Sequence, residues 1–118
     1  MLDKTKIKEL KKLAKEDSNA LIELAELYGG ATVRKGLRLY IKAAKRNNAR
    51  AQSVLATYYY SRGMSYFSIG IEYAIENRGS IYQYMEKAKE WCEKAIKNGD
   101  KTSSSMLNKI KDILFKLS

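Results

Sequence analysis

Basic side chains without any acidic neighbour mark the stretch from Leu27 to Ile71, which holds eight Lys or Arg and no Asp or Glu. They are Arg34, Lys35, Arg38, Lys42, Lys45, Arg46, Arg50 and Arg62. The formal net charge of the chain is +10, so most of the excess positive charge lies here. The planar fork of arginine suits carboxylate and phosphate groups. The stretch therefore predicts a docking surface for an acidic partner, with a solvated helix face as the alternative.

Aromatic side chains gather in and beside the same stretch. They are Tyr58, Tyr59, Tyr60, Tyr66, Phe67 and Tyr73. Tyrosine is a common anchor of protein interfaces, and aromatic rings beside cations also stack bases in single-stranded nucleic-acid binders. Three consecutive tyrosines on a helix point about 100° apart, so we expect one in the core and one or two on the surface. We predict Tyr58 and Tyr60 as the anchors, against the alternative that all these rings pack in the core.

The side chains of most catalytic sites are missing. The chain has no histidine, which removes the commonest general base and most transition-metal sites. Cys92 is the only cysteine, and its place on an apolar helical stripe predicts a small core residue rather than a nucleophile. We therefore predict a non-enzymatic protein with no catalytic residue, no metal site and no cofactor.

Helices must position these side chains, because the chain has no proline and its apolar residues recur at three- and four-residue spacing. The pattern predicts an all-α fold of six or seven helices in one domain, residues 1–118. Helices are expected at 3–16, 19–28, 33–46, from about 49 onward, at 81–97 and after Ser103. Their expected boundaries are Asp17 or Ser18, Gly29-Gly30, Thr32, Asn47-Asn48, Asn98-Gly99 and Ser103.

The course of the chain after Tyr60 allows two interpretations. Residues 61–63 end the helix and a separate helix covers 64–76, or one long helix continues to Asn77 and tolerates its glycines. In either case Ser80, with Gln83 three residues later, is predicted to open the following helix as a capping box.

A repeated packing pattern is visible in the first half of the chain. The series Ala51, Leu55, Ala56 and Tyr59 repeats a series 31 residues upstream, which consists of Ala20, Leu24, Ala25 and Tyr28. The repeat continues in Tyr40, Lys42, Ala43 and Ala44, and then in Ala88, Trp91, Lys94, Ala95 and Gly99. Over residues 19–100 the chain resembles the Sel-one-like repeat, a relative of the tetratricopeptide repeat.

This resemblance implies a short right-handed α-solenoid of antiparallel helix pairs that binds other proteins or peptides. The first pair would cover residues 18–48. The second would cover 49–99 with a 21-residue insertion at about 61–80, because 29 residues separate Tyr59 from Ala88 and only 8 separate Tyr28 from Gly36. Helices in 1–17 and 101–118 would cap the two ends.

The expected partner is an acidic protein or peptide, and the expected function is that of an adaptor. The alternative is nucleic-acid binding through residues 34–62, including a small inhibitor of a nucleic-acid-processing complex. The start of the chain lacks the apolar run of a signal peptide, and no apolar segment is long enough for a membrane span. We therefore expect a cytoplasmic protein.

Overall fold

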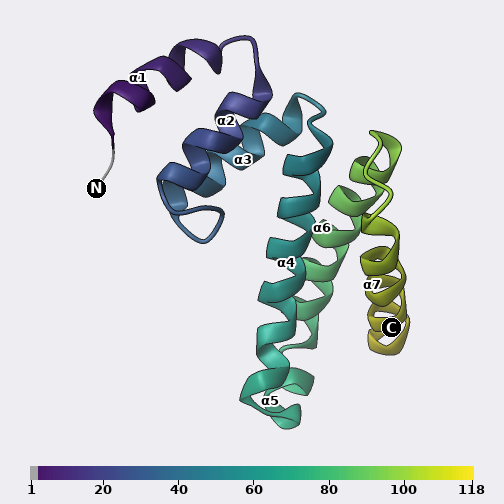
Figure 1. Ribbon diagram of the computed structural model, residues 1–118. Coiled ribbons are helices and arrows are strands. Elements are labelled where there is room, and N and C mark those ends of the chain that lie inside the picture. Colours follow the sequence, from purple (N-terminus) through teal and green to yellow (C-terminus); the bar gives the residue numbers. More distant parts are fainter. Residues whose placement is uncertain (1–2) are drawn as a thin grey trace.

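The computed structural model describes residues 3–118, which form helices joined by short turns and no strand. This confirms the all-α prediction. The helices are α1 (Lys4–Leu13), α2 (Ser18–Leu27), α3 (Arg34–Lys45), α4 (Ala49–Ile69), α5 (Ile71–Glu76), α6 (Arg78–Lys97) and α7 (Ser103–Leu117). Each long helix packs mainly on the next one along the chain, and α4 and α6 form a long hairpin closed by α5 (Figure 1). The resulting shape is elongated, 49 × 31 × 17 Å.

Several predicted helix boundaries are confirmed. The side chain of Asp17 caps α2 by accepting a hydrogen bond from the backbone N–H of Asn19, 2.9 Å away. Gly29, Gly30 and Gly99 have positive φ angles, and so does Asn47 at 64°. These residues reverse the chain after a helix, where glycine and asparagine tolerate the left-handed conformation best.

The predicted starts of three helices are wrong. α3 begins after Val33 rather than Thr32, and no side chain caps it. α7 begins after Thr102, and the nearby carboxylate of Asp100 accepts the backbone N–H of Thr102 at 3.1 Å. α6 begins after Asn77, so Ser80 lies inside the helix and its N–H bonds to the Asn77 carbonyl at 3.0 Å. The capping box therefore does not form, because the helix has already started three residues earlier.

Neither interpretation of the chain after Tyr60 is correct. α4 continues through Gly63 and ends at Gly70, whose φ of 153° interrupts the helix. Gly63 is buried against α6, where an added Cβ would lie 2.7 Å from Met85 Cε and 3.3 Å from Tyr84 Cβ. The absence of a side chain at Gly63 thus permits close packing of α4 on α6. The residues of the predicted insertion lengthen the α4–α6 hairpin, and α5 lies at its tip.

The core consists of two clusters that meet between α4 and α6. The first joins α1, α2, α3 and the start of α4 around Leu21 and the fully buried Tyr40. The second joins α4, α6 and α7 around Met85 and Ile110. The Ala and Leu residues of both repeated series are buried, and Tyr59 contacts both clusters. Within residues 3–118, no helix combines the length and apolar character that crossing a membrane requires.

Candidate interaction surface

The outer face of α3 is entirely basic. The exposed residues of this helix are Arg34, Lys35, Arg38, Lys42 and Lys45. They lie opposite its buried side, which includes Gly36 and Tyr40. The first turn of α3 contains no acidic residue, so the positive end of the helix dipole adds to the positive potential of this face.

The other basic residues of the acid-free stretch have different surroundings. Arg46 donates from Nη1 to the carbonyl oxygen of Ala14 at 2.5 Å, which holds the end of α1. Arg50 is exposed near the start of α4, and Arg62 lies on the same helix about 18 Å further along its axis. The eight basic residues therefore do not all lie in one patch.

Five tyrosines form a continuous row across the α4–α6 hairpin, which we call the tyrosine row. Neighbouring ring centres are separated by 5.2 Å for Tyr58 and Tyr59, 6.5 Å for Tyr59 and Tyr84, 6.4 Å for Tyr84 and Tyr66, and 5.7 Å for Tyr66 and Tyr73. Offset-stacked and edge-to-face contacts between aromatic rings are more stabilising than the burial of their apolar area alone. The five rings therefore contact one another along the row without any partner present.

Two cations lie over this row. The guanidinium carbon of Arg62 is 5.8 Å from the ring centre of Tyr84, and Lys87 Nζ is 5.3 Å from that of Tyr59. Both distances allow a cation–π interaction. Burial, followed by the charges of the nearby Tyr58 and Tyr84, raises the pKa of Tyr59 above its ordinary value.

Two shallow hollows lie along the row and share Tyr66 and Tyr84. The first, of about 200 Å³, is also lined by Arg62, Ser65, Ile69 and Tyr73. The second, of about 180 Å³, is also lined by Ser80, Gln83 and Lys87. Each hollow combines aromatic rings with one cation and with hydroxyl or amide groups, which is the composition of an interface rather than of a closed small-molecule pocket.

The row lies on the side of the hairpin that α7 leaves uncovered. Ser53 and Thr57 of α4 contact α7, since Ser53 Oγ is 3.2 Å from Ser103 Oγ and Thr57 Oγ1 is 3.9 Å from Met106 Sδ. At about 100° per residue, the stripe that runs through Tyr58 and Arg62 lies about 140° around the helix axis from the stripe through Ser53 and Thr57. The row is therefore accessible along the hairpin.

The two predicted anchors have different environments. Tyr58 is half-buried at one end of the row, in edge contact with Tyr59. Tyr60 is half-buried against the second core cluster. Lys35, another predicted contact, has its Nζ 4.2 Å from the ring centre of Tyr28, at the turn between α2 and α3.

Sequence reasoning missed Tyr84 and Lys87, which lie outside the acid-free stretch. A Tyr and a Lys three residues apart on one predicted helix were a weak signal, and only the pairing of α4 with α6 brings them to Tyr59 and Tyr66. Cys92, predicted as a core residue, is confirmed as fully buried. Burial raises the pKa of its thiol to about 11, so the thiol stays protonated and unreactive.

No group of three side chains able to hold a metal ion occurs in residues 3–118. Comparisons of the chain with protein-family models, with curated proteins and with solved structures found no match. The resemblance to Sel-one-like repeats therefore stays a prediction.

Proposed function

We propose that this chain is a non-enzymatic protein–protein interaction module that binds an acidic partner protein through the tyrosine row. The observation that carries the proposal is the row itself, with five rings in a continuous series of contacts, Arg62 and Lys87 above them, and α7 packed on the other side of α4. We further propose that the helix pairs form a short right-handed α-solenoid, which the sequential packing of α2, α3, α4, α6 and α7 supports.

The chemistry of the row fits an acidic protein surface. Tyrosine and arginine dominate the binding energy of many protein interfaces, and rings that are already packed together lose little entropy on binding. Arg62 and Lys87 would pair with carboxylates of the partner, while the ring edges and hydroxyls would contact its apolar and polar groups. The basic face of α3 would attract the same partner from a distance and speed its association.

Single-stranded nucleic acid is the second candidate, and a small inhibitor that occupies a nucleic-acid partner surface belongs with it. Aromatic rings beside cations favour it, because bases stack on exposed ring faces. However, Tyr59 stacks beside Tyr84 and Tyr66 beside Tyr73, with interplanar angles of 27° and 17°, so a base could insert between these rings only by separating them. This arrangement favours a protein partner over bases.

The test begins with capture of partners by the tagged full chain from a cell lysate, with and without nuclease. The captured protein is then purified and titrated by calorimetry against the chain and two charge-reversal variants. The first is Arg62→Glu with Lys87→Glu, in the row. The second is Lys109→Glu with Lys111→Glu on exposed positions of α7, which changes the net charge equally.

We expect the row variant to weaken binding at least about 100-fold, because like charges would face each other across the interface, and the α7 variant to weaken it only a few-fold. Circular dichroism should show equal helix content in all three proteins. Equal losses in both variants would mean that only net charge matters and would contradict the proposal. Capture that disappears with nuclease would favour the nucleic-acid candidate instead.

A further inference from the structure

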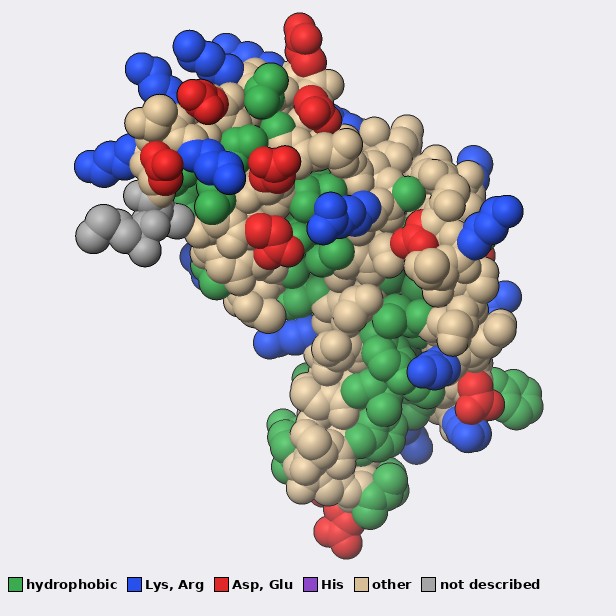
Figure 2. Space-filling view, viewed as in Figure 1, with side chains coloured by type: hydrophobic (Ala, Val, Ile, Leu, Met, Phe, Trp, Pro, Cys, Tyr) green, Lys and Arg blue, Asp and Glu red, His purple; other side chains and the backbone are tan. Residues whose placement is uncertain are grey.

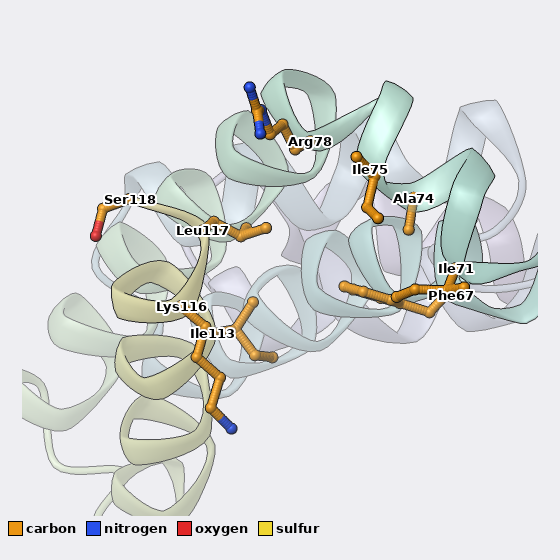
Figure 3. A pocket seen from close by; sticks show the side chains of 9 residues that line it. All are labelled: Phe67, Ile71, Ala74, Ile75, Arg78, Ile113, Lys116, Leu117 and Ser118. Atoms are coloured by element: carbon orange, nitrogen blue, oxygen red, sulfur yellow. The ribbon is translucent and has the colours of Figure 1, made fainter.

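An apolar groove lies at the tip of the molecule, on the other side of the hairpin from the tyrosine row. It runs between α5 and the end of α7 and has a volume of about 350 Å³ (Figure 3). Its apolar lining consists of Phe67 from α4, Ile71, Ala74 and Ile75 from α5, and Ile113 and Leu117 from α7. Three helices thus contribute to one apolar surface.

Two apolar residues of this groove are exposed and are not part of the buried core. Ile71 and Ile75 are 64% and 56% exposed, and their four-residue spacing places them on the same side of α5. Figure 2 shows apolar side chains in a continuous band over the lower half of the molecule. A contiguous exposed apolar patch with a polar rim is typical of an interaction site.

The charges at the groove indicate the charge of its occupant. The two charged side chains that line it, Arg78 and Lys116, are both basic. Lys116 Nζ also lies 3.0 Å from Asp112 Oδ2 in an exposed ion pair. Such pairs contribute little to stability, so Lys116 can pair with a carboxylate of the occupant instead. Glu72 and Glu76 of α5 are outside the lining. A net charge of +10 opposes the approach of a second copy of this chain, so an acidic occupant fits best.

The shape of the groove indicates a helix. Its walls are helices, and residues 3–118 present no strand edge on which an extended peptide could add a strand. An amphipathic helix can lay apolar residues spaced by three, four and seven positions into a groove of this kind. Its flanking residues would then lie beside Arg78 and Lys116 at the rim.

We propose that the groove between α5 and α7 binds one amphipathic helix of a further partner, with apolar anchors in the groove and acidic residues beside Arg78 and Lys116. This goes beyond the proposed function, because the tyrosine row and the groove lie on different sides of the hairpin. One chain would thus hold two partners together, which is the task of an adaptor.

The test uses a displayed library of 16-residue peptides. In each peptide some positions are fixed as alanine, which favours a helix, and all other positions are random. The full chain is the target, and two variants serve for comparison. Ile75→Glu places a charge in the groove. Phe115→Glu is the matched control, because Phe115 is also a large exposed apolar residue, 79% exposed, but is outside the groove lining.

We expect enriched peptides with apolar residues at helical spacing and a net negative charge. Their affinity, measured by fluorescence anisotropy, should fall at least 10-fold with Ile75→Glu and less than 2-fold with Phe115→Glu. Charge reversal by Arg78→Glu should reduce the affinity for acidic peptides and increase it for versions in which the acidic residues are replaced by lysine.

Three results would overturn the proposal. The first is a selection that enriches no peptide or enriches peptides without acidic residues. The second is binding that Ile75→Glu leaves unchanged. The third is a groove filled by another occupant, seen as dimerisation of the chain that Ile75→Glu abolishes, or as binding of the chain to phosphatidylglycerol vesicles that the same variant abolishes. The row variant Arg62→Glu with Lys87→Glu should bind the selected peptides normally, so this test is independent of the proposed function.

Discussion

The two helix pairs, α2–α3 and α4–α6, share a packing pattern but differ in length and in the residues that they expose. In each pair a small series of Ala and Leu is buried, and one glycine lies at the closest contact. The first pair is short and turns at Gly29-Gly30, and its outer helix exposes only basic residues. The second pair is much longer, and it carries the tyrosine row on one side, while the apolar groove lies on the other side near its tip. We propose that the common pattern provides stability, while the longer second pair provides the surfaces for binding.

The largest expected difference between the pairs concerns their glycines. A Cβ on Gly36 would lie 2.0 Å from the carbonyl oxygen of Gly30 and 2.8 Å from its carbon, and this backbone cannot move aside. We expect Gly36→Ala to lower the free energy of unfolding by more than about 3 kcal/mol. At Gly63 the closest atom is the end of the flexible Met85 side chain, so Gly63→Ala should cost about 1 kcal/mol or less.

Urea denaturation followed by circular dichroism measures both effects, and Gly79→Ala is the control. Gly79 lies near the start of α6 with no atom within 4 Å of an added Cβ, so alanine there should stabilise the protein by about 0.5 to 1 kcal/mol. Equal losses for Gly36→Ala and Gly63→Ala would show that the two contacts are equally rigid, contrary to the comparison.

Alkaline pH should weaken both pairs, through one buried group in each. Burial, then the hydrogen bond and the charge of Glu26, raise the pKa of Tyr40 to about 12. Burial, then the charges of Asp100 and Glu93, raise the pKa of Cys92 to about 11. A pKa that is higher in the folded state gives stability that is complete below the unfolded pKa and is lost as the pH rises through the folded value.

Stability should therefore fall from about pH 9 for Cys92 and from about pH 10 for Tyr40, by on the order of 2 kcal/mol for each group. The measurement is the free energy of unfolding between pH 7 and pH 11 for the protein, Cys92→Ala and Tyr40→Phe. Cys92→Ala should flatten the curve between about pH 9 and 11, and Tyr40→Phe should flatten it above about pH 10. Parallel curves for all three proteins would disprove the assignment.

The sequence predicts those parts of the fold that depend on local chemistry. Asn47 and Gly29 end helices because few other residues adopt their positive φ angles, and the apolar spacing defines the helices themselves. The end of α4 was not predictable in this way. Gly63 has a low helix propensity, yet it lies inside α4, where it packs against Met85 of α6, more than 20 residues later in the sequence. The helix ends at Gly70 instead.

The candidate site was predictable only in its α4 half. The acid-free stretch contains Tyr58, Arg62 and Tyr66, so these residues attract attention in the sequence. Tyr84 and Lys87 are more than 15 residues away in a stretch of mixed charge, and they join the row because α4 and α6 pack side by side. The register between two helices depends on their packing, which composition and spacing alone do not determine.

The central claim, that the tyrosine row of the second pair binds the partner, is tested most directly by NMR of the chain with ¹³C-labelled tyrosine rings. The acidic partner captured above is added at increasing concentration. We predict shifts of the ring signals of Tyr58, Tyr66, Tyr73 and Tyr84, while the signals of Tyr28 and Tyr40 in the first pair stay in place. Shifts confined to Tyr28, beside Lys35 at the start of α3, would place the binding surface on the first pair and contradict the account.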